Sequence, residues 1–343
     1  MATLKDIAEY TGYSQATISR VLHSDPKIRV TDVTRHEIIY AAKELHYQTK
    51  AQPRRYRKRG SLQITIAEAL TPYRRRDNPY YLQMKIYIKQ ICNGYGVKLS
   101  HAYADGQQSQ LLPATAADGV IALGMFSDKQ IERLTRMSRN LVFVDASPDE
   151  TRFDSVVLNA ELGIQQALDY LGARKHRAIG YIGPNGEIDG SAYPVLDLRK
   201  QCFIRYMQER GEFHEQYMFE TLPNSEEECE ALLAQIRAGK VLPTALVAAD
   251  EAAAISAVRT IQIAGLSVPH DISVLGFSDM DNPPPIVPPL TSIRTHAEVM
   301  SAAAIHMLLE RIEAANETAG FLPLQIVIAP TLNEQQSVAG PMR

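Results

Sequence analysis

Five side chains close together near the start of the chain have the types and the spacing that could recognise DNA. Gln15 can form two hydrogen bonds with the N6 and N7 edge of adenine, and Arg20 can form two with O6 and N7 of guanine. Ala16 offers a methyl group for thymine, and the hydroxyl groups of Ser14 and Thr17 can bind phosphate. On residue type alone, Ser14 could equally be a helix cap and Arg20 an ordinary surface residue.

The residues around this group predict three short helices within residues 1–47. Thr3 has the side chain of an N-cap, and the apolar residues that follow it recur at helical spacing until Gly12. Ser14 can cap a second helix, and Thr31 can cap a third one. Two short helices joined by a tight turn that contains glycine form the helix-turn-helix pattern.

The net charge of −3 at pH 7 conceals a basic N-terminal part and an acidic remainder. Residues 1–60 hold 12 Lys and Arg against 6 Asp and Glu, and residues 61–343 hold 24 against 33. Residues 48–60 lack apolar periodicity and carry six of the basic side chains, which is typical of a linker. A basic part on an acidic body suggests contact with a polyanion, although a solvated basic tail would have the same charge.

From residue 62 onward, short apolar runs alternate with amphipathic segments of helical period. This alternation predicts parallel sheets with crossover helices. There are more candidate strands than one small sheet needs, so we expect two α/β lobes, with the proline-rich residues 281–290 as a crossover between them. The expected strands are 62–67, 119–123, 141–144, 155–158, 178–182, 244–248, 272–277 and 322–329, and the expected helices are 80–93, 128–137, 160–171, 198–209, 225–238, 251–264 and 296–314.

The composition excludes several classes of protein. The chain is 45% hydrophobic and 22% charged, which is typical of a globular protein and excludes a mainly disordered one. The three cysteines are widely spaced and indicate neither a disulfide framework nor a metal site. The first residues carry charges where a signal peptide needs an apolar run, and no apolar run reaches the ~18 residues of a membrane span. We therefore expect a cytoplasmic protein with no metal, no cofactor and no membrane contact.

Four segments resemble one protein family. Residues 3–22 fit the pattern T-x-x-D-I-A-x-x-x-G-x-S-x-x-T-[VI]-S-R-V-L at twelve positions. Residues 244–250 are similar to A-[LI]-[VF]-A-x-[NS]-D, and residues 268–279 are similar to V-P-x-D-I-S-V-[VI]-G-[FY]-D-D. Residues 288–294 are similar to P-P-L-T-[ST]-[IV]-[RK]. Over nearly its whole length, the chain thus resembles the LacI/GalR family of bacterial repressors.

The resemblance implies an N-terminal all-α helix-turn-helix headpiece, a basic hinge, and a two-lobed α/β core of the periplasmic-binding-protein type. It also implies a homodimer, because a two-fold operator requires a pair of headpieces. The expected boundaries are 1–47 for the headpiece, 48–60 for the hinge, 61–157 with 291–317 for the N-lobe, and 158–290 with 318–343 for the C-lobe.

In the family, the second headpiece helix reads double-stranded operator DNA. The resemblance therefore assigns base contacts to Gln15, Ala16 and Arg20, and phosphate contacts to Thr3, Ser14 and Thr17.

The hinge departs from the family pattern N-x-x-A-R-x-L. Pro53 is acceptable only in the first turn of a hinge helix, and Tyr56 stands where the family has a leucine that wedges into the minor groove. We expect Arg54, Arg55 and Tyr56 to contact DNA, with a merely flexible basic tether as the alternative.

The resemblance further implies a sugar effector between the lobes, where loops meet the carboxyl ends of strands. Sugar hydroxyl groups require planar polar partners and an aromatic face. The residues at the family's binding positions are Arg199 and Asp250, with Tyr80, Tyr81, Asn159, Phe277 and Asp279 as further candidates. Asp250 could also cap the helix that follows it. Ala249, Cys202 and Ser278 differ from the residues that the family usually has.

Within the family, residues 1–8, 25–30, 78–82 and 197–199 are similar to those of galactoside-responsive repressors. The expected function is that of a sequence-specific DNA-binding repressor of a carbohydrate operon, controlled by a small galactoside. The alternatives are a regulator that responds to a non-galactoside or phosphorylated ligand, a transport binding protein, and a sugar-processing enzyme. The enzyme is disfavoured because the sequence has no P-loop, no G-x-S-x-G and no metal-ligand spacing.

Overall fold

The computed structural model divides the chain into two units, residues 1–60 and residues 61–343. The structure describes residues 3–22, 28, 30, 34, 37–38, 41–42, 45, 62–70, 79–105, 110–112, 116–184, 198–221, 227, 229–278, 287–314 and 322–341. No helix in these ranges is both long and apolar enough to cross a membrane.

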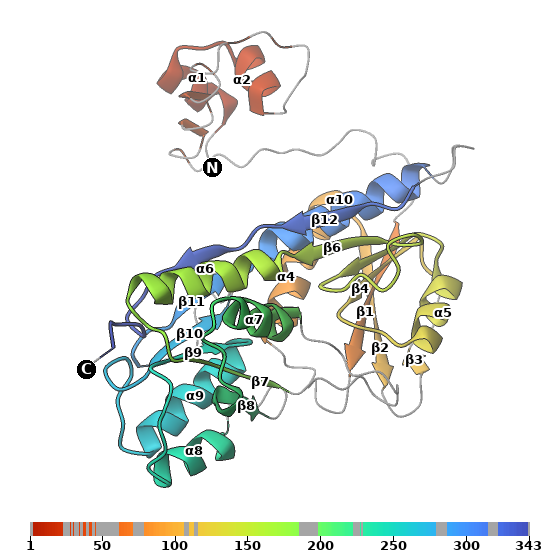
Figure 1. Ribbon diagram of the computed structural model, residues 1–343. Helices are drawn as coiled ribbons and strands as arrows, with labels where there is room; N and C mark the ends of the chain where they lie inside the picture. The colour runs from red at the N-terminus through yellow and green to blue at the C-terminus, as the bar shows by residue number, and fades with distance from the viewer. Residues whose placement is uncertain are drawn as a thin grey trace. The chain divides into compact units, whose positions relative to one another are not determined.

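The first unit contains the expected helix-turn-helix (Figure 1). Helix α1 spans Leu4–Thr11, and helix α2 spans Gln15–Leu22. Gly12 ends α1 with φ of +75°, a left-handed conformation that favours glycine. Ile7, Ile18 and Val21 pack with three residues of the predicted third helix, of which 34, 37, 38, 41 and 42 are helical. The three residues of that helix in the core are Ile38, Ala41 and Ala42.

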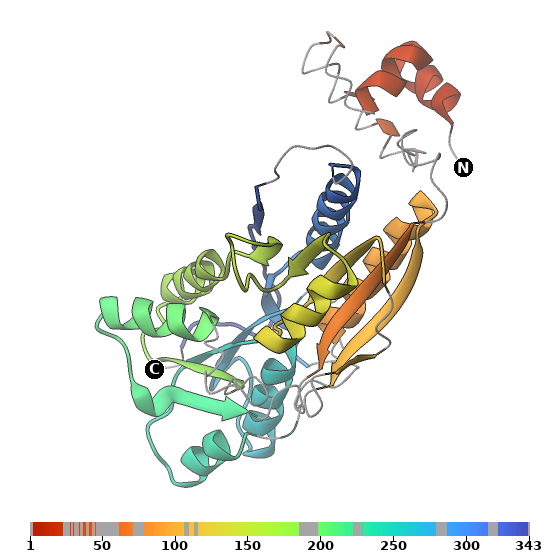
Figure 2. The same cartoon turned by 90° about the vertical axis from the view of Figure 1, so that its right-hand side faces the viewer.

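The first sheet of the second unit has the order β12-β6-β5-β4-β1-β2-β3. All its neighbours are parallel except β2 and β3. Helices α4 and α10 pack together on one face, and α5 covers the other face (Figure 2). The strands are β1 (Gln63–Leu70), β2 (Lys98–Asp105), β3 (Gln110–Leu112), β4 (Gly119–Leu123), β5 (Leu141–Val144), β6 (Asp154–Leu158) and β12 (Gln325–Ile328), and the helices are α4 (Pro79–Tyr95), α5 (Asp128–Met137) and α10 (Ala297–Ala314).

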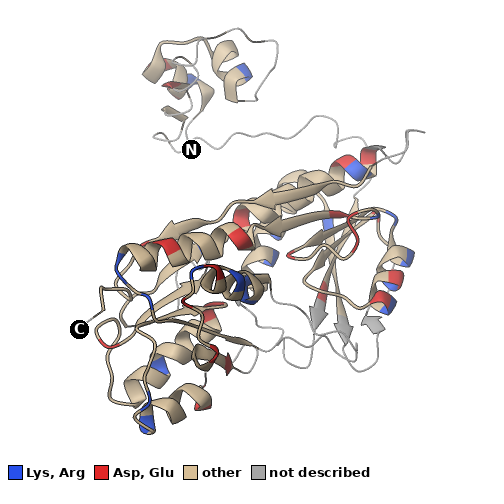
Figure 3. Cartoon of the chain, in the orientation of Figure 1, with Lys and Arg blue, Asp and Glu red and all other residues tan. Residues whose placement is uncertain are grey.

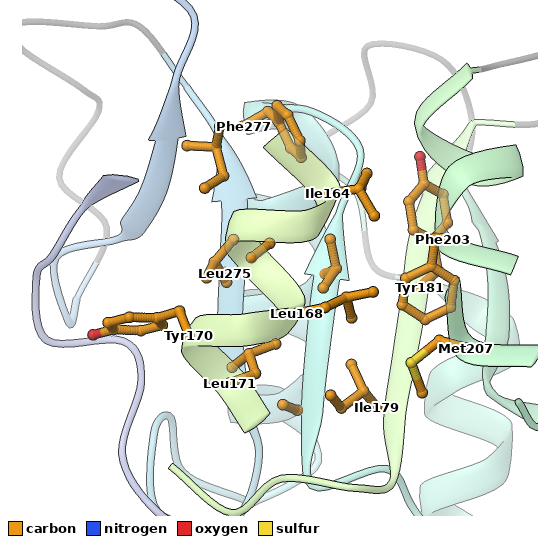
Figure 4. Packing of buried hydrophobic residues seen from close by; sticks show 14 of the residues in the cluster. Ile164, Leu168, Tyr170, Leu171, Ile179, Tyr181, Phe203, Met207, Leu275 and Phe277 are labelled. Carbon is orange, nitrogen blue, oxygen red and sulfur yellow. The ribbon is translucent and has the colours of Figure 1, made fainter. Parts of the chain in front are cut away.

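The second sheet has the order β13-β11-β10-β9-β7-β8, and only β11 and β13 are antiparallel. Helices α6 and α7 bury one face, as the packing around Tyr181, Phe203 and Phe277 shows (Figure 4). Helices α8 and α9 bury the other face. The strands are β7 (Ile179–Pro184), β8 (Met218–Thr221), β9 (Ala245–Ala248), β10 (Ser273–Phe277), β11 (Thr291–Arg294) and β13 (Thr331–Asn333), and the helices are α6 (Ala160–Ala173), α7 (Leu198–Glu209), η2 (Glu215–Tyr217), α8 (Glu230–Arg237) and α9 (Glu251–Ile263).

The chain crosses between the two sheets three times, and two crossings differ from the expected boundaries. Strand β11 belongs to the second sheet, so the boundary expected between residues 290 and 291 is wrong and the chain crosses after Arg294. Strand β12 belongs to the first sheet, so the crossing expected near residue 318 lies between Ile328 and Thr331. The proline-rich residues 281–290 come between β10 and β11 in the sequence, and both strands belong to the second sheet, so this segment does not mark a crossover; its described part is 287–290.

The sequence analysis missed strands that lie at or next to a sheet edge. Strand β2 alternates exposed and buried residues, such as His101 and Ala102, so it contains no continuous apolar run. Strand β8 pairs with β7 alone and buries only Phe219 well. Edge strands need less apolar surface than central ones, which is why apolar runs predicted the central strands and missed these.

Candidate DNA interface and effector site

The second headpiece helix separates its polar side chains from its core side chains. Gln15, Ala16 and Arg20 are exposed on α2, while Ile18 and Val21 are buried against the rest of the headpiece. The helix therefore presents the predicted base-reading residues on its solvent side. This arrangement is what a helix in the major groove requires, because its N-terminal side chains must reach base edges.

The three predicted phosphate-binding hydroxyl groups all take part in helix capping. Thr3 Oγ1 donates to Asp6 Oδ2 at 2.9 Å, and the Thr3 backbone N–H donates to the same oxygen at 2.6 Å. That backbone hydrogen bond is the largest of the effects that lower the pKa of Asp6. Ser14 Oγ accepts from the Thr17 backbone N–H at 3.1 Å and lies 2.9 Å from Thr17 Oγ1. The caps fix the start of each helix, and phosphate contact by these residues stays a prediction.

The predicted hinge contacts Arg54, Arg55 and Tyr56 lie outside the described residues, as does the effector candidate Asp279.

In the first lobe, two tyrosines converge on one carboxylate. The Tyr81 hydroxyl donates to Asp145 Oδ2 at 2.8 Å, and the Tyr80 hydroxyl lies 3.4 Å from Asp145 Oδ1 and 3.5 Å from Met300 Sδ. Tyr81 is buried and Tyr80 is half-buried. The helix α4 thus brings both phenols to the carboxyl end of β5.

Asp145 is a further candidate for the effector site, and the sequence did not predict it. It directly follows β5 and has φ of +67°, a left-handed conformation that Asp tolerates better than most residues. An acidic residue immediately after a predicted strand was a usable signal, because ligands in open α/β sheets bind beyond the carboxyl ends of strands. The signal was not recognised because no spacing pattern connects Asp145 to the tyrosines.

In the second lobe, Arg199 and Phe277 come together. The Arg199 guanidinium lies 5.6 Å from the centroid of the Phe277 ring, within the range of a cation–π contact. Phe277 also packs on Gly163 of α6, where an added Cβ would lie 2.8 Å from the ring. The ring at the end of β10 is therefore part of the core that this sheet shares with α6 and α7 (Figure 4).

Asp250 and Asn159 both serve as N-caps. Asp250 Oδ1 accepts from the Ala253 backbone N–H at 2.9 Å and so begins α9. Asn159 Oδ1 accepts from the Leu162 backbone N–H at 2.9 Å and so begins α6. The capping alternative for Asp250 is confirmed, and contact with an effector stays a prediction for both residues.

Next to Asp250, a hydrogen bond joins two further polar side chains. Ser278 Oγ donates to Glu251 Oε1 at 3.0 Å. Ser278 follows β10, and Glu251 opens α9 behind β9, so the pair lies at the carboxyl ends of neighbouring strands. The polar and aromatic groups of the second lobe therefore gather at the edge where the fold binds ligands.

Charged residues elsewhere in the core are mixed in sign. Helix α5 carries both acidic and basic residues along its length (Figure 3), namely Asp128, Lys129, Glu132, Arg133 and Arg136. Such mixing is typical of solvated helix faces.

Comparison with known proteins identifies the family. Residues 3–50 match the bacterial regulatory proteins of the lacI family, and residues 168–338 match a periplasmic binding protein-like domain. The transcriptional repressor PurR of Yersinia pestis (strain Pestoides F) is 32% identical, over 100% of this chain and 99% of PurR. This chain belongs to the LacI family. It is a LacI-family transcriptional regulator with a helix-turn-helix DNA-binding domain and a periplasmic-binding-like core, as the resemblance implied.

Other relatives of this LacI-family chain are also named as regulators. GalR of Streptococcus thermophilus is 30% identical, over 92% of this chain and 94% of GalR. GanR of Bacillus subtilis (strain 168) is 28% identical, over 97% of this chain and 100% of GanR.

Solved structures show the same fold. The lac repressor dimer bound to operator and the anti-inducer ONPF matches with a TM-score of 0.64 and 21% identity, over 98% of this chain and 99% of that one. The complex of the regulator CelR with cellobiose matches with a TM-score of 0.61 and 20% identity, over 98% of this chain and 100% of that one.

Proposed function

We propose that this LacI-family regulator is a homodimeric repressor of a carbohydrate operon, and that a small galactoside bound between its two lobes controls its affinity for operator DNA. The observation that carries the sugar site is the pairing of polar with aromatic groups at the strand ends. Tyr80 and Tyr81 surround Asp145 in the first lobe, and Arg199 lies against Phe277 in the second. Aromatic faces beside carboxylate and guanidinium groups are what a neutral sugar needs.

The operator site is supported by the exposed face of α2. Gln15, Ala16 and Arg20 are exposed on α2, which supports their contact with base edges. A repressor also needs two half-sites to be bound at once, which a dimer with one headpiece on each subunit provides.

Control by the effector follows from differential affinity. A sugar that binds one arrangement of the lobes more tightly shifts the population towards it, and DNA affinity changes with that population. The galactoside is proposed because the sequence is similar to that of galactoside-responsive repressors in four segments. The competing effector class is a non-galactoside or a phosphorylated sugar.

Two measurements on the full chain test the proposal. Operator sequences are first selected from random double-stranded DNA, and their binding is measured at several salt concentrations. We expect affinity to fall as salt rises, since basic groups displace counterions from phosphate. Thermal unfolding is then measured with lactose, allolactose, melibiose, galactose, glucose and sugar phosphates. A ligand at about 100 times its Kd raises the free energy of unfolding by about 2.7 kcal/mol.

Three outcomes separate the parts of the proposal. A galactoside that raises the unfolding temperature and releases the selected DNA supports it. A galactoside that binds and strengthens DNA binding supports the galactoside site and shows that the ligand acts as a corepressor. If only another sugar or a sugar phosphate binds, the galactoside assignment is wrong while the DNA-binding role stands.

A further inference from the structure

Ser278 and Glu251 form a polar pair that no pattern in the sequence predicts. Ser278 directly follows β10, and Glu251 is the first residue of α9 after β9. Because β9 and β10 are parallel neighbours, their carboxyl ends lie at the same edge of the second sheet. The hydroxyl of Ser278 donates to Glu251 Oε1 at 3.0 Å, so a side chain from one strand end positions a carboxylate at the next.

This pair continues the wall formed by Arg199 and Phe277. Phe277 is the residue before Ser278, and its buried ring packs on Gly163. The guanidinium of Arg199 lies 5.6 Å from the ring centroid. A cation, an aromatic ring, a hydroxyl group and a carboxylate therefore follow one another along one edge, and they come from three separate elements.

Glu251 differs from its neighbour Asp250 in what holds it. The Asp250 carboxylate accepts a backbone N–H of its own helix at 2.9 Å, which fixes its orientation as a cap. Glu251 is held through a side-chain hydroxyl, and a hydroxyl can rotate to serve a different partner. The contact between Ser278 and Glu251 can therefore be exchanged for one with a ligand.

We propose that Glu251, positioned by Ser278, is a specificity-determining residue of the effector site and selects a neutral sugar over its phosphate ester. This inference rests on the proposed function. A carboxylate accepts hydrogen bonds from two neighbouring sugar hydroxyl groups, and such charge-assisted bonds are stronger than neutral ones. The same carboxylate, next to that of Asp250, repels an anionic ester at short range and so opposes the attraction of such an ester to Arg199. The phosphorylated effector is therefore the class that this edge disfavours.

The test measures binding by calorimetry on the full chain with two probes, methyl β-D-galactopyranoside and D-galactose 6-phosphate. We expect the wild-type chain to bind the neutral probe at least tenfold more tightly. The E251Q variant keeps the shape and removes the charge, so it should bind the neutral probe about tenfold more weakly and reduce the preference over the phosphate. The S278A variant should weaken neutral binding by a smaller factor, since it only loosens Glu251.

A matched control and a rescue separate this role from a general effect of charge. Glu230 is likewise the first residue of a helix, α8, and is exposed, so E230Q should bind both probes as the wild type does. In the E251Q background, S278D returns a carboxylate to the other member of the pair and should recover part of the neutral affinity. Thermal unfolding without ligand verifies that each variant is folded.

The following results would overturn the proposal or one part of it. Neutral binding by E251Q within twofold of the wild type overturns the role of Glu251 while leaving the sugar site in place. A wild-type chain that prefers the phosphate ester overturns the selectivity. A wild-type chain that binds neither probe overturns the proposed galactoside function and, with it, this inference. This result differs from the first one, in which the wild type binds the neutral probe.

Discussion

The phenol oxygen of Tyr81 lies 2.8 Å from Oδ2 of Asp145, although 64 residues separate the two in the sequence. Tyr81 is buried in the first lobe, so its ring is fixed and its hydroxyl holds the carboxylate at the end of β5. The left-handed backbone of Asp145 adds to this constraint, since φ of +67° restricts which residues can replace it.

The D145N variant should therefore fold normally and bind the effector about tenfold more weakly, because Asn tolerates the same backbone conformation and lacks the charge. The Y81F variant should lose about 1 kcal/mol of unfolding free energy with the hydrogen bond. Calorimetry and urea unfolding measure the two effects. D128N, which removes an exposed carboxylate from the same lobe, is the control. Unchanged affinity in D145N would remove Asp145 from the effector site.

Gly163 and Gly172 offer a matched pair within α6. A Cβ at Gly163 would lie 2.8 Å from Phe277, whereas at Gly172 the nearest atom would be 3.8 Å away. The G163A variant should lower the free energy of unfolding by about 1–3 kcal/mol and weaken effector binding, since Phe277 and Arg199 must shift. The G172A variant should be neutral or stabilising by up to about 1 kcal/mol, because Ala favours the helix. Equal behaviour of the two variants in urea unfolding would contradict the close packing.

His176 makes the stability of the second lobe depend on pH. Its Nε2 donates to the Ala339 carbonyl at 2.6 Å, and its Nδ1 lies 2.9 Å from Thr244 Oγ1. Burial, with a further contribution from Arg174, lowers the pKa of His176 below its usual value near 6.5.

The unfolded chain therefore binds this proton at a higher pH than the folded chain does. The stabilising contribution is fully present above about pH 6.5 and is lost as pH falls towards the folded pKa, with a slope of at most about 1.4 kcal/mol per pH unit. Urea unfolding between pH 5 and 8 should show a shallower slope for H176Q than for the wild type. Other histidines cancel in that difference, and identical slopes would show that His176 does not carry the effect.

Arg20 should contribute to operator recognition in proportion to its base contact. The R20A variant should weaken binding to a selected operator by about 10- to 100-fold, which corresponds to about 1–3 kcal/mol. The R136A variant removes an equally charged side chain from the exposed surface of α5 and should bind as the wild type does. A mobility-shift titration at fixed salt measures both. An equal loss in the two variants would indicate a general charge effect in place of base reading.

The headpiece could be predicted from sequence because its determinants are local. Thr3 and Asp6 cap each other across three residues, and Gly12 ends the same helix, so the signals lie within one or two turns. The central strands were predicted for a related reason, since burial on both faces requires continuous apolar runs such as those of β4 and β5.

The lobe boundaries and the contacts between strand ends could not be predicted from local sequence signals. The contact of Asp145 with two tyrosines, and that of Ser278 with Glu251, depend on which strand ends lie next to each other. Which sheet β11 and β12 join depends on the path of a chain that crosses between the two sheets three times. The sequence of each strand does not indicate which sheet it joins. Only the folded arrangement carries that information.

Strand β12 completes the first sheet from a position near the end of the chain. Residues 325–328 pair with β6. The buried carboxylate of Asp154 in β6 accepts hydrogen bonds from the Arg311 guanidinium and from the Leu324 backbone N–H. Nearly all of the second lobe lies between β6 and β12 in the sequence. During synthesis, the edge of β6 that pairs with β12 consequently remains unpaired until the second lobe has been translated. No single cut divides the chain into two consecutive pieces that each contain a complete lobe. The two lobes must therefore be encoded together in one chain.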